Sequence, residues 1–435
     1  TIAKQLANAD EEHQRASAQA RVALNRQADI KATREGLAVV SEWLDSEQER
    51  FEAHHALTEC VEVTVGDWIT DTKSGAPTSP PVLRVRTDAS DIQDFRNVAR
   101  SVTAAWLEQA QGLALSVNAR PEIMRNALAK IGMRVEPGLD GLTALCNLWE
   151  ALKDPQLFDP DVKALLYWVA SAAEVAMIRE LTAKTDEEPS TTLLLSKLRE
   201  SNEKIGEPLF QALGYGTNFP FHIATFDSGK TTEAEIGADF GVILQIGLED
   251  RDICRAALIQ AKLAKNGCAN IHRASETRGN MHQLTALQRL PGSGYYLFLD
   301  KDPVTGPPAT VVSADVIAQR LLVQHAVSTV TSLTPSQCNV ASSTDAVDFG
   351  TFFGFTLLDD GLACESIVQA IRAVGGTATK QIAAKIMIIQ IGKSPLDHEL
   401  TAELEKLGYR KSRSKWDLDE ILHHARSERD EGLSR

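Results

Sequence analysis

Two successive apolar segments near the middle of the chain constrain its fold more than any other feature. The first, Ile236–Ile246, is almost wholly apolar after Asp239, and the second, Ala256–Lys262, is apolar until it reaches Gln260. Apolar residues at consecutive positions, rather than at alternate ones, are typical of strands that are covered on both faces. The sequence therefore predicts an α/β fold in which these two strands lie inside a sheet.

Polar side chains gather where these two strands begin and end. Glu233, Glu235 and Asp239 precede the first apolar run, and Gln260 and Lys262 close the second. Because side chains alternate across a strand, residues two apart share a face, so the carboxylates can point one way and Gln260 and Lys262 can point together. Carboxylate oxygens are ligands that Mg²⁺ prefers. The pattern indicates a site for a divalent metal and a phosphate.

The order of these residues resembles the PD-(D/E)XK nuclease superfamily. Gly237-Ala238-Asp239, followed about one strand later by Gln260-Ala261-Lys262, is similar to its Mrr-like Gln-x-Lys variant, and the superfamily includes restriction and anti-phage defence enzymes. The family core runs helix, strand, strand with Asp, strand with Lys, helix, strand. The chain supplies candidates in that order between Glu187 and Asp300: helix Thr191–Ala212, strand Phe221–Phe226, strands Ile236–Ile246 and Ala256–Lys262, helix Met281–Arg289 and strand Gly294–Leu299.

The resemblance implies a restriction-endonuclease-like mixed-sheet core and a metal-dependent endonuclease that hydrolyses phosphodiester bonds, in DNA, in bacterial defence against phage or plasmid. It implies Mg²⁺ or Mn²⁺ as the cofactor and Asp239 as a direct metal ligand. Lys262 would orient or help to deprotonate the attacking water. Gln260, which replaces a commoner acidic residue, would orient water or metal through its amide oxygen. Gln283, in the closing helix, is a candidate to face the site and contact the substrate, and a polar residue that flanks the core is the alternative.

A second carboxylate is needed to complete the metal site, and four residues are candidates. Glu233, six residues before Asp239, ranks first, and Glu188, in the first helix of the core, ranks second as a metal ligand. Glu235 and Glu203 are the remaining candidates. Alternative interpretations stay open, because Glu188 would also stabilise a helix amino terminus electrostatically and Glu203 would suit a solvated helix face.

A nucleotide-binding interpretation is the main alternative. Asp227-Ser-Gly-Lys-Thr-Thr232, with Gly229, Lys230 and Thr231, resembles the end of a Walker A loop, and the strand Tyr295–Asp300 resembles a Walker B strand. However, Ala224 stands where the first glycine belongs, so the glycine-rich wrap around the phosphates is incomplete. A P-loop ATPase therefore remains one alternative, and a non-catalytic scaffold subunit with the nuclease fold remains another.

The net charge of −14 opposes a DNA-binding surface made by the chain alone, because affinity for the phosphate backbone normally comes from clustered Lys and Arg. A partner protein of a defence complex could supply the contact, and the polar amino-terminal helices leave homo-oligomers open. No apolar run approaches the roughly 20 residues that span a bilayer, so a cytoplasmic protein without membrane contact is expected. The six cysteines show no C-x-x-C spacing, which argues against a zinc ribbon.

At 435 residues the chain exceeds a typical single domain. Composition and periodicity predict a mostly helical amino-terminal domain over residues 1–185, the nuclease core over 186–345, and a smaller α/β carboxy-terminal region over 346–435. Within the last region a helix is expected at Lys385–Gln390. The sequence leaves open whether the substrate is DNA or RNA, what sequence or structure is cut, whether an ATPase partner is needed, and how many copies assemble.

Overall fold

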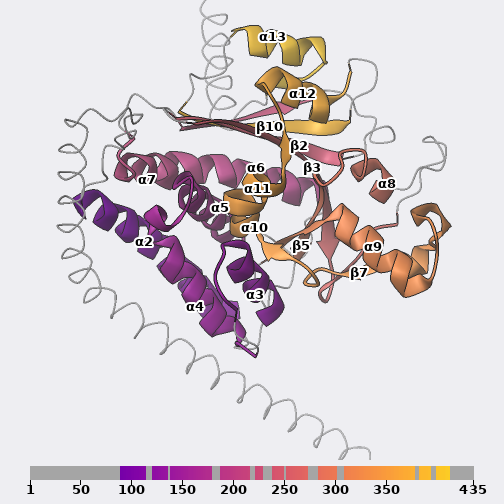
Figure 1. Ribbon diagram of the computed structural model, residues 1–435, viewed down its shortest axis with the longest axis horizontal. Helices are drawn as coiled ribbons and strands as arrows, with labels where there is room; N and C mark the ends of the chain where they lie inside the picture. Colours follow the sequence, from indigo (N-terminus) through magenta and orange to yellow (C-terminus); the bar gives the residue numbers. More distant parts are fainter. Residues whose placement is uncertain are drawn as a thin grey trace, which may run out of the picture.

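A computed structural model describes residues 89–113, 120–135, 138–178, 187–215, 221–228, 238–248, 251–272, 283–300, 308–377, 382–392 and 398–411. Predictions for residues 1–88 lie outside the described residues. The same holds for Gly229, Lys230, Thr231, Glu233 and Glu235. The described part is an α/β structure in which helices cover both faces of one mixed sheet (Figure 1).

The sheet has nine strands in the described part of the chain. Its order is β11-β1-β10-β2-β3-β5-β6-β8, with β9 paired to β3. The β10–β2 and β3–β5 pairs are parallel, and the other pairs are antiparallel. The strands are β1 (Phe221–Asp227), β2 (Ala238–Leu248), β3 (Arg251–Ala264), β5 (Gly294–Asp300), β6 (Ala309–Ser313), β8 (Val347–Asp348), β9 (Leu362–Ala363), β10 (Ala383–Ile391) and β11 (Arg410–Lys411). A separate ribbon pairs β4 (Cys268–Asn270) with β7 (Asn339–Ala341). The prediction of an α/β fold with a mixed sheet is confirmed.

The two buried strands that the apolar runs predict are β2 and β3, and the structure pairs them as an antiparallel hairpin. Their register runs from Phe240 opposite Ile259 to Leu248 opposite Arg251. Successive residues of β2 from Phe240 to Leu244 are buried, which requires cover on both faces of the sheet. Helices supply that cover, as the pattern indicates.

One face is covered by α5 (Val162–Ile178) and α6 (Glu187–Ser201), which lie below the sheet in Figure 1. α6 continues through a π-helical segment, Asn202–Gly206, into α7 (Glu207–Ala212). α5 also contacts α10 (Phe349–Thr351) and the π-helical segment Phe352–Thr356. A Cβ on Gly354 would lie 2.5 Å from the carbonyl oxygen of Lys163 in α5, so this crossing requires glycine.

The opposite face is covered by three helices. They are α8 (Gln283–Leu287), α9 (Ala314–His325) and α12 (Ile367–Gly375), with α13 (His398–Lys406) contacting α12. The apolar residues of α12 recur at helical spacing because one side of the helix packs on the sheet: it contacts β2, β3 and β10, and Ala370, Ile371 and Val374 are buried. Figure 1 shows α12 and α13 on the side of the sheet away from α5 and α6.

The helix predicted at Lys385–Gln390 is wrong, because these residues form β10, a central strand between β1 and β2. A short apolar run has no periodicity that separates a buried strand from a buried helix. Its isoleucines, at 386, 388, 389 and 391, are β-branched and favour the strand. β8 and β10 both come from residues 346–435, so this region and the predicted nuclease core share one sheet.

The predicted core elements occur in the expected chain order: α6, β1, β2, β3, α8 and β5. In the sheet, however, β10 separates β1 from β2. Chain order is therefore as the sequence predicts, whereas the neighbour of β1 comes from far along the chain, as the pairing of Phe221 with Ile391 shows.

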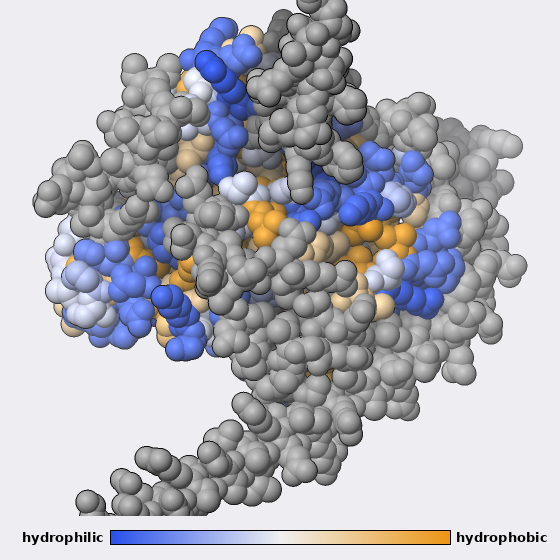
Figure 2. Space-filling view, turned by 180° about the vertical axis from the view of Figure 1, so that it is seen from behind, coloured by the Kyte–Doolittle hydropathy of each residue, from blue (hydrophilic) through white to orange (hydrophobic). Residues whose placement is uncertain are grey.

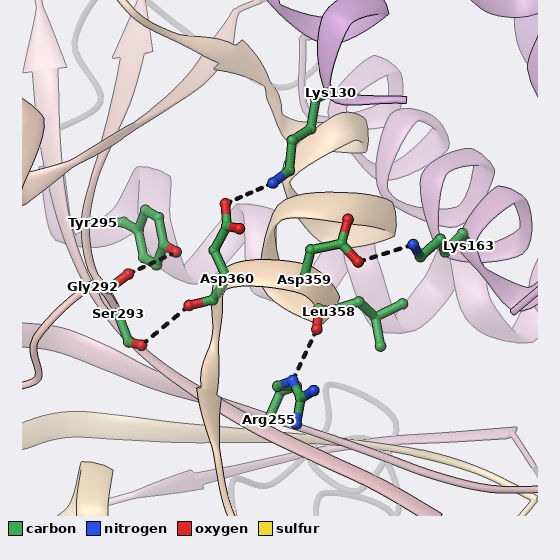
Figure 3. A network of polar contacts seen from close by, with 9 residues as sticks. All are labelled: Lys130, Lys163, Arg255, Gly292, Ser293, Tyr295, Leu358, Asp359 and Asp360. Carbon is green, nitrogen blue, oxygen red and sulfur yellow. Dashed lines mark hydrogen bonds and ion pairs between the residues drawn. The ribbon is translucent and has the colours of Figure 1, made fainter. Parts of the chain in front are cut away.

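The amino-terminal helices α2 (Ala89–Leu113), α3 (Pro121–Lys130) and α4 (Gly141–Leu152) adjoin the α5 side (Figure 1). Figure 3 shows how α11 (Leu357–Asp360) links this side to the sheet. Lys130 contacts Asp360 at 2.6 Å and Lys163 contacts Asp359 at 2.9 Å, while Arg255 of β3 donates through Nε to a backbone carbonyl of α11 at 2.8 Å. α11 thus contacts both the helical layer and the sheet.

The surface seen from behind is mostly hydrophilic where it is described, with hydrophobic side chains showing between the polar regions (Figure 2). The large apolar side chains most exposed in the described residues are Met133, Leu157, Val316 and Val323. Scattered apolar side chains of this kind are ordinary on protein surfaces. Among the helices that the structure describes, none combines the length and apolar character that a bilayer crossing requires.

Candidate functional site

The polar ends of β2 and β3 meet at a group made by Asp239, Gln260 and Lys262. Gln260 donates through Nε2 to Oδ2 of Asp239 at 2.5 Å, and the backbone N–H of Ala261 donates to the same oxygen at 2.8 Å. The Asp239 carboxylate therefore continues the contact between the two strands just beyond the pair formed by Phe240 and Ile259. The sequence predicts these side chains as one group, and the structure brings Asp239 and Gln260 into contact.

The face on which the group lies follows from Gly241. A Cβ on Gly241 would lie 2.6 Å from Cβ of Val374, so this side of β2 is turned toward α12. Asp239, two residues earlier, points to the same side. Leu258 is opposite Gly241 in β3, so Gln260 and Lys262, two and four residues later, share that face. All three side chains thus lie on the face covered by α8, α9 and α12.

Burial differs within the group. Gln260 is 1% exposed and Lys262 is 7% exposed, whereas Asp239 is half-buried. A buried ammonium is costly unless charged or polar groups surround it, and Lys262 has polar interactions in the structure. The arrangement places the buried Lys262 side chain on the same face of the sheet as a carboxylate that solvent can still reach.

The orientation of the Gln260 amide is set by its contacts. Nε2 donates to the Asp239 carboxylate and to the backbone carbonyl of Ala261 at 3.2 Å, and both of these groups only accept hydrogen bonds. The amide nitrogen therefore faces Asp239, and Oε1 points away from it. Among the described residues, both hydrogen bonds of this side chain are made by Nε2.

Gln283 begins α8, which contacts β2 and β3. The helix packs closely on Gly294, where any Cβ would clash with the carbonyl oxygen of Leu287. Gly294 is beside Leu258 in the β3–β5 register, so α8 lies on the same face as Asp239. Gln283 is 2% exposed, and its Oε1 is buried without a hydrogen-bond partner in the described structure. Such an acceptor costs about 1–3 kcal/mol, which is tolerated most readily where a ligand or water binds.

Tyr296 also lies on the face of the sheet that carries Asp239. No motif in the sequence identifies it as a site residue. The β3–β5 register places Tyr296 beside Gln260 and Phe298 beside Lys262. Both aromatic rings are almost fully buried and they stack with centroids 5.9 Å apart. The two-residue spacing between Gly294 and Tyr296 indicates that both residues lie on the same face of β5. The sequence does not indicate that β5 pairs with β3, so it does not place Tyr296 beside Gln260.

The remaining carboxylate candidates are only partly described. Glu188 lies in the first turn of α6, but its side chain is outside the described set, and Glu203 is exposed in the π-helical segment after α6. Thr192, one turn after Glu188, accepts a hydrogen bond from Lys385 at 2.7 Å. Lys385 is beside Phe240 in the sheet, so α6 adjoins the face opposite to the Asp239 side chain. Among the described residues, no group of three or more His, Cys, Asp or Glu side chains is arranged to hold a metal ion.

A second acidic group lies near the ends of β5 and β6. Glu174 of α5 accepts a hydrogen bond from the backbone N–H of Ala309 at 2.9 Å, and Asp348 caps α10 through Thr351. Burial, together with the nearby Asp348 carboxyl, raises the pKa of Glu174 well above its usual value, and burial raises the pKa of Asp348. Carboxyls whose pKa is raised by burial and whose oxygens already accept hydrogen bonds from the protein are poorer metal ligands than ionised, accessible ones.

Asp300, at the end of the strand that resembles a Walker B strand, is 2% exposed and bonded to Arg120, which precedes α3. This carboxylate therefore has a cationic partner within the protein. It links the amino-terminal helices to β5, and its surroundings are those of a buried ion pair.

The fold and the group at Asp239 define a mixed α/β protein with a polar site where two adjacent central strands begin and end. Comparison of the chain with known proteins found no matching family model, no matching curated protein and no matching solved structure.

Proposed function

We propose that this protein is a metal-dependent nuclease with a restriction-endonuclease-like core, of the Mrr-like PD-(D/E)XK type, and that it hydrolyses phosphodiester bonds in DNA. The observation that carries the proposal is the hydrogen bond between Gln260 and Asp239, with Lys262 on the same face. The chain order α6, β1, β2, β3, α8, β5 supports it. In the sheet, β10 lies between β1 and β2.

The donors at this site suit a hard cation. Asp239 offers a carboxylate oxygen, a ligand type that Mg²⁺ and Mn²⁺ prefer. The Gln260 amide turns its nitrogen toward that carboxylate, so its oxygen would orient a water rather than share the ligand position of Asp239. Glu233, within residues 229–237 outside the described part, is the proposed second carboxylate. When bound, the cation supplies charge neutralisation at the phosphate and a more acidic water.

The protein's own groups have distinct tasks in this scheme. Lys262, held at 7% exposure on the Asp239 face, orients the attacking water and stabilises negative charge as it develops on the phosphoryl oxygens. Gln260 holds Asp239 through Nε2 and directs Oε1 to the water. Gln283, with its buried unpartnered oxygen, would accept a hydrogen bond from substrate or ordered water.

The proposed setting is bacterial defence against phage or plasmid, and it rests on the family resemblance. The net charge of −14 favours a partner protein that helps to hold DNA, because backbone affinity depends on clustered cations. A non-catalytic scaffold subunit would have the same negative charge. The charge therefore does not distinguish a nuclease from a scaffold, whereas a cleavage assay does.

The test is cleavage of supercoiled and linear DNA by the full chain with Mg²⁺ or Mn²⁺. Lys262→Ala is expected to reduce cleavage roughly 10²- to 10⁴-fold, the range for loss of a group that assists proton transfer. Asp239→Ala is expected to reduce it at least as much, because the bound cation contributes several kcal/mol of charge stabilisation. Asp252→Ala and Lys265→Ala are matched controls, because both side chains are exposed. Asp252 lies at the opposite end of β3 from Gln260.

Cutting that survives both site substitutions would contradict the nuclease site. If the wild type cleaves neither DNA nor RNA, alone or with candidate partners, the scaffold alternative takes its place. ATP binding that is lost in Lys230→Ala would instead support the P-loop alternative.

A further inference from the structure

Two cysteines face each other across β3 and β9, away from the Asp239 site. Arg255 is opposite Ala363 and Ala256 is opposite Leu362 in this antiparallel pair. The backbone N–H of Cys364 donates to the carbonyl of Cys254 at 3.0 Å, so the register continues by one residue. Cys254 and Cys364 are therefore direct cross-strand neighbours with side chains on the same face of the sheet.

The register brings their backbones to a distance that a disulfide can bridge. Opposed residues of a hydrogen-bonded antiparallel pair have Cα atoms about 5.5 Å apart, and disulfides span Cα distances of about 4.4–6.8 Å. Because the pair is hydrogen-bonded, its Cβ atoms are expected at the upper end of the roughly 4.5–5.5 Å range. Disulfides have Cβ atoms about 3.5–4.5 Å apart, so the two residues have to approach each other for the bond to form. A bond here is geometrically accessible and has a cost, which makes it easier to reduce.

The two thiols differ in access. Cys254 is 6% exposed, whereas Cys364 is half-buried and its thiol donates to the carbonyl of Leu362 at 3.6 Å. A small reagent therefore reaches Cys364 first, and Cys254 lies behind it as the neighbouring thiol. Both are free cysteines in the structure.

We propose that Cys254 and Cys364 are a redox site that forms a reversible disulfide by exchange with a small-molecule disulfide such as glutathione disulfide. The Cys364 thiolate attacks one sulfur of the reagent and releases one glutathione thiolate. The Cys254 thiolate then attacks the Cys364 sulfur of the mixed disulfide and releases the second. The protein loses two electrons and two protons, and the reagent becomes two molecules of glutathione.

Exchange at this pair is slow near neutral pH. Burial, with a smaller contribution from Cys364, raises the pKa of Cys254 to about 12, and burial raises the pKa of Cys364. Because the thiolate is the attacking species, the reaction has to be followed to equilibrium. The two cysteines lie at the opposite end of β3 from Gln260, so a redox site here is independent of the nuclease proposal.

The bond would join β3 to the segment that leads into α12, the helix that covers the Asp239 face. A crosslink between residues so far apart in sequence removes conformational freedom from the unfolded chain. The oxidised protein is therefore expected to unfold at a higher temperature than the reduced protein.

The experiment incubates the folded full chain at increasing ratios of oxidised to reduced glutathione, blocks remaining thiols and identifies linked tryptic peptides by mass. Trypsin releases Cys254 in the peptide 252–255 and Cys364 in the peptide 321–372, which also contains Cys338. The linked pair is expected to accumulate with oxidation and to disappear with dithiothreitol. It should persist in Cys338→Ser and be absent from Cys364→Ser, whose half-buried position tolerates serine.

Cys268→Ser is the matched control, because it removes an exposed thiol that has no cysteine opposite it. Ala341 is the residue paired with Cys268. This variant should keep both the link and the rise in unfolding temperature, whereas Cys364→Ser should lose the rise. The proposal is overturned if Cys254 and Cys364 stay unlinked in the folded protein under the most oxidising condition. A link from Cys254 to any other cysteine overturns it equally.

Discussion

The carboxyl of Asp239 and the carboxyls of Glu174 and Asp348 differ in their exposure to solvent and in their hydrogen-bond donors. At the start of β2, Asp239 is half-buried and accepts from Gln260 and from the backbone of Ala261. Between α5 and β6, Glu174 and Asp348 are buried and bonded to the protein's own backbone. Desolvation favours the neutral acid at the second group, whereas Asp239 keeps contact with solvent. The contrast separates the carboxyl that we propose as a ligand-binding group from carboxyls that are hydrogen-bonded within the fold.

The largest expected effect tests the ligand-binding side of the comparison. Asp239→Asn keeps the size of the side chain and removes its charge, so cleavage should fall roughly 10²- to 10⁴-fold while the free energy of unfolding changes by less than about 1 kcal/mol. Cleavage assays and denaturant titration measure the two quantities. A variant that cuts normally would place Asp239 with the structural carboxyls.

Removal of a structural carboxyl should affect stability instead. Asp348 accepts from the backbone N–H of Thr351 at 3.0 Å and from its Oγ1 at 2.6 Å, and both residues are buried. Asp348→Ala removes the helix cap and leaves these donors unsatisfied, at a cost of about 2–3 kcal/mol. Asp348→Asn, which retains an acceptor, should lose clearly less in the same titration. Equal losses would show that the cap is not the cause.

A second carboxylate beside Asp239 tests whether this position binds a cation. Gln260→Glu replaces the hydrogen-bond donor with a like charge, which should lower the free energy of unfolding by about 1–2 kcal/mol in the presence of a chelator. Mg²⁺ should restore stability, because a ligand that binds only the folded state stabilises it. Thermal unfolding with and without Mg²⁺ measures this. A variant that Mg²⁺ does not stabilise would contradict a cation site at Asp239.

Glu174→Gln tests the raised pKa at the buried group. Since the pKa of Glu174 is higher in the folded than in the unfolded protein, folded Glu174 binds the proton more tightly, and stability falls as pH rises above the unfolded value of about 4.5. The substituted glutamine keeps an acceptor for the N–H of Ala309 and cannot ionise. The variant should therefore gain stability relative to the wild type as the pH is raised from about 4 to about 8, measured by denaturant titration at each pH.

A constant difference between the two proteins across this range would mean that Glu174 does not titrate differently in the folded state. Glu207→Gln is a suitable control, because Glu207 is exposed in the first turn of α7 and lies outside this group.

Local sequence pattern predicted much of the central sheet. Apolar runs identified β2, β3 and β5, and the two-residue period placed Gln260 and Lys262 on one face, where the structure has them. The pattern failed at β10, since a buried strand and a buried helix have the same composition over so short a run. It also missed Tyr296, because its position beside Gln260 depends on which strand lies next to β3.

The sequence by itself determined the chemistry available at the strand ends, the order of the elements and the faces on which neighbouring residues of each strand lie, because these depend on local periodicity. The tertiary structure alone decided that β10 separates β1 from β2, that Glu174 approaches Asp348, and that Cys254 faces Cys364. Each of these depends on pairing between segments distant in the chain. Such pairing is selected by the packing of the whole core, and no local pattern specifies it.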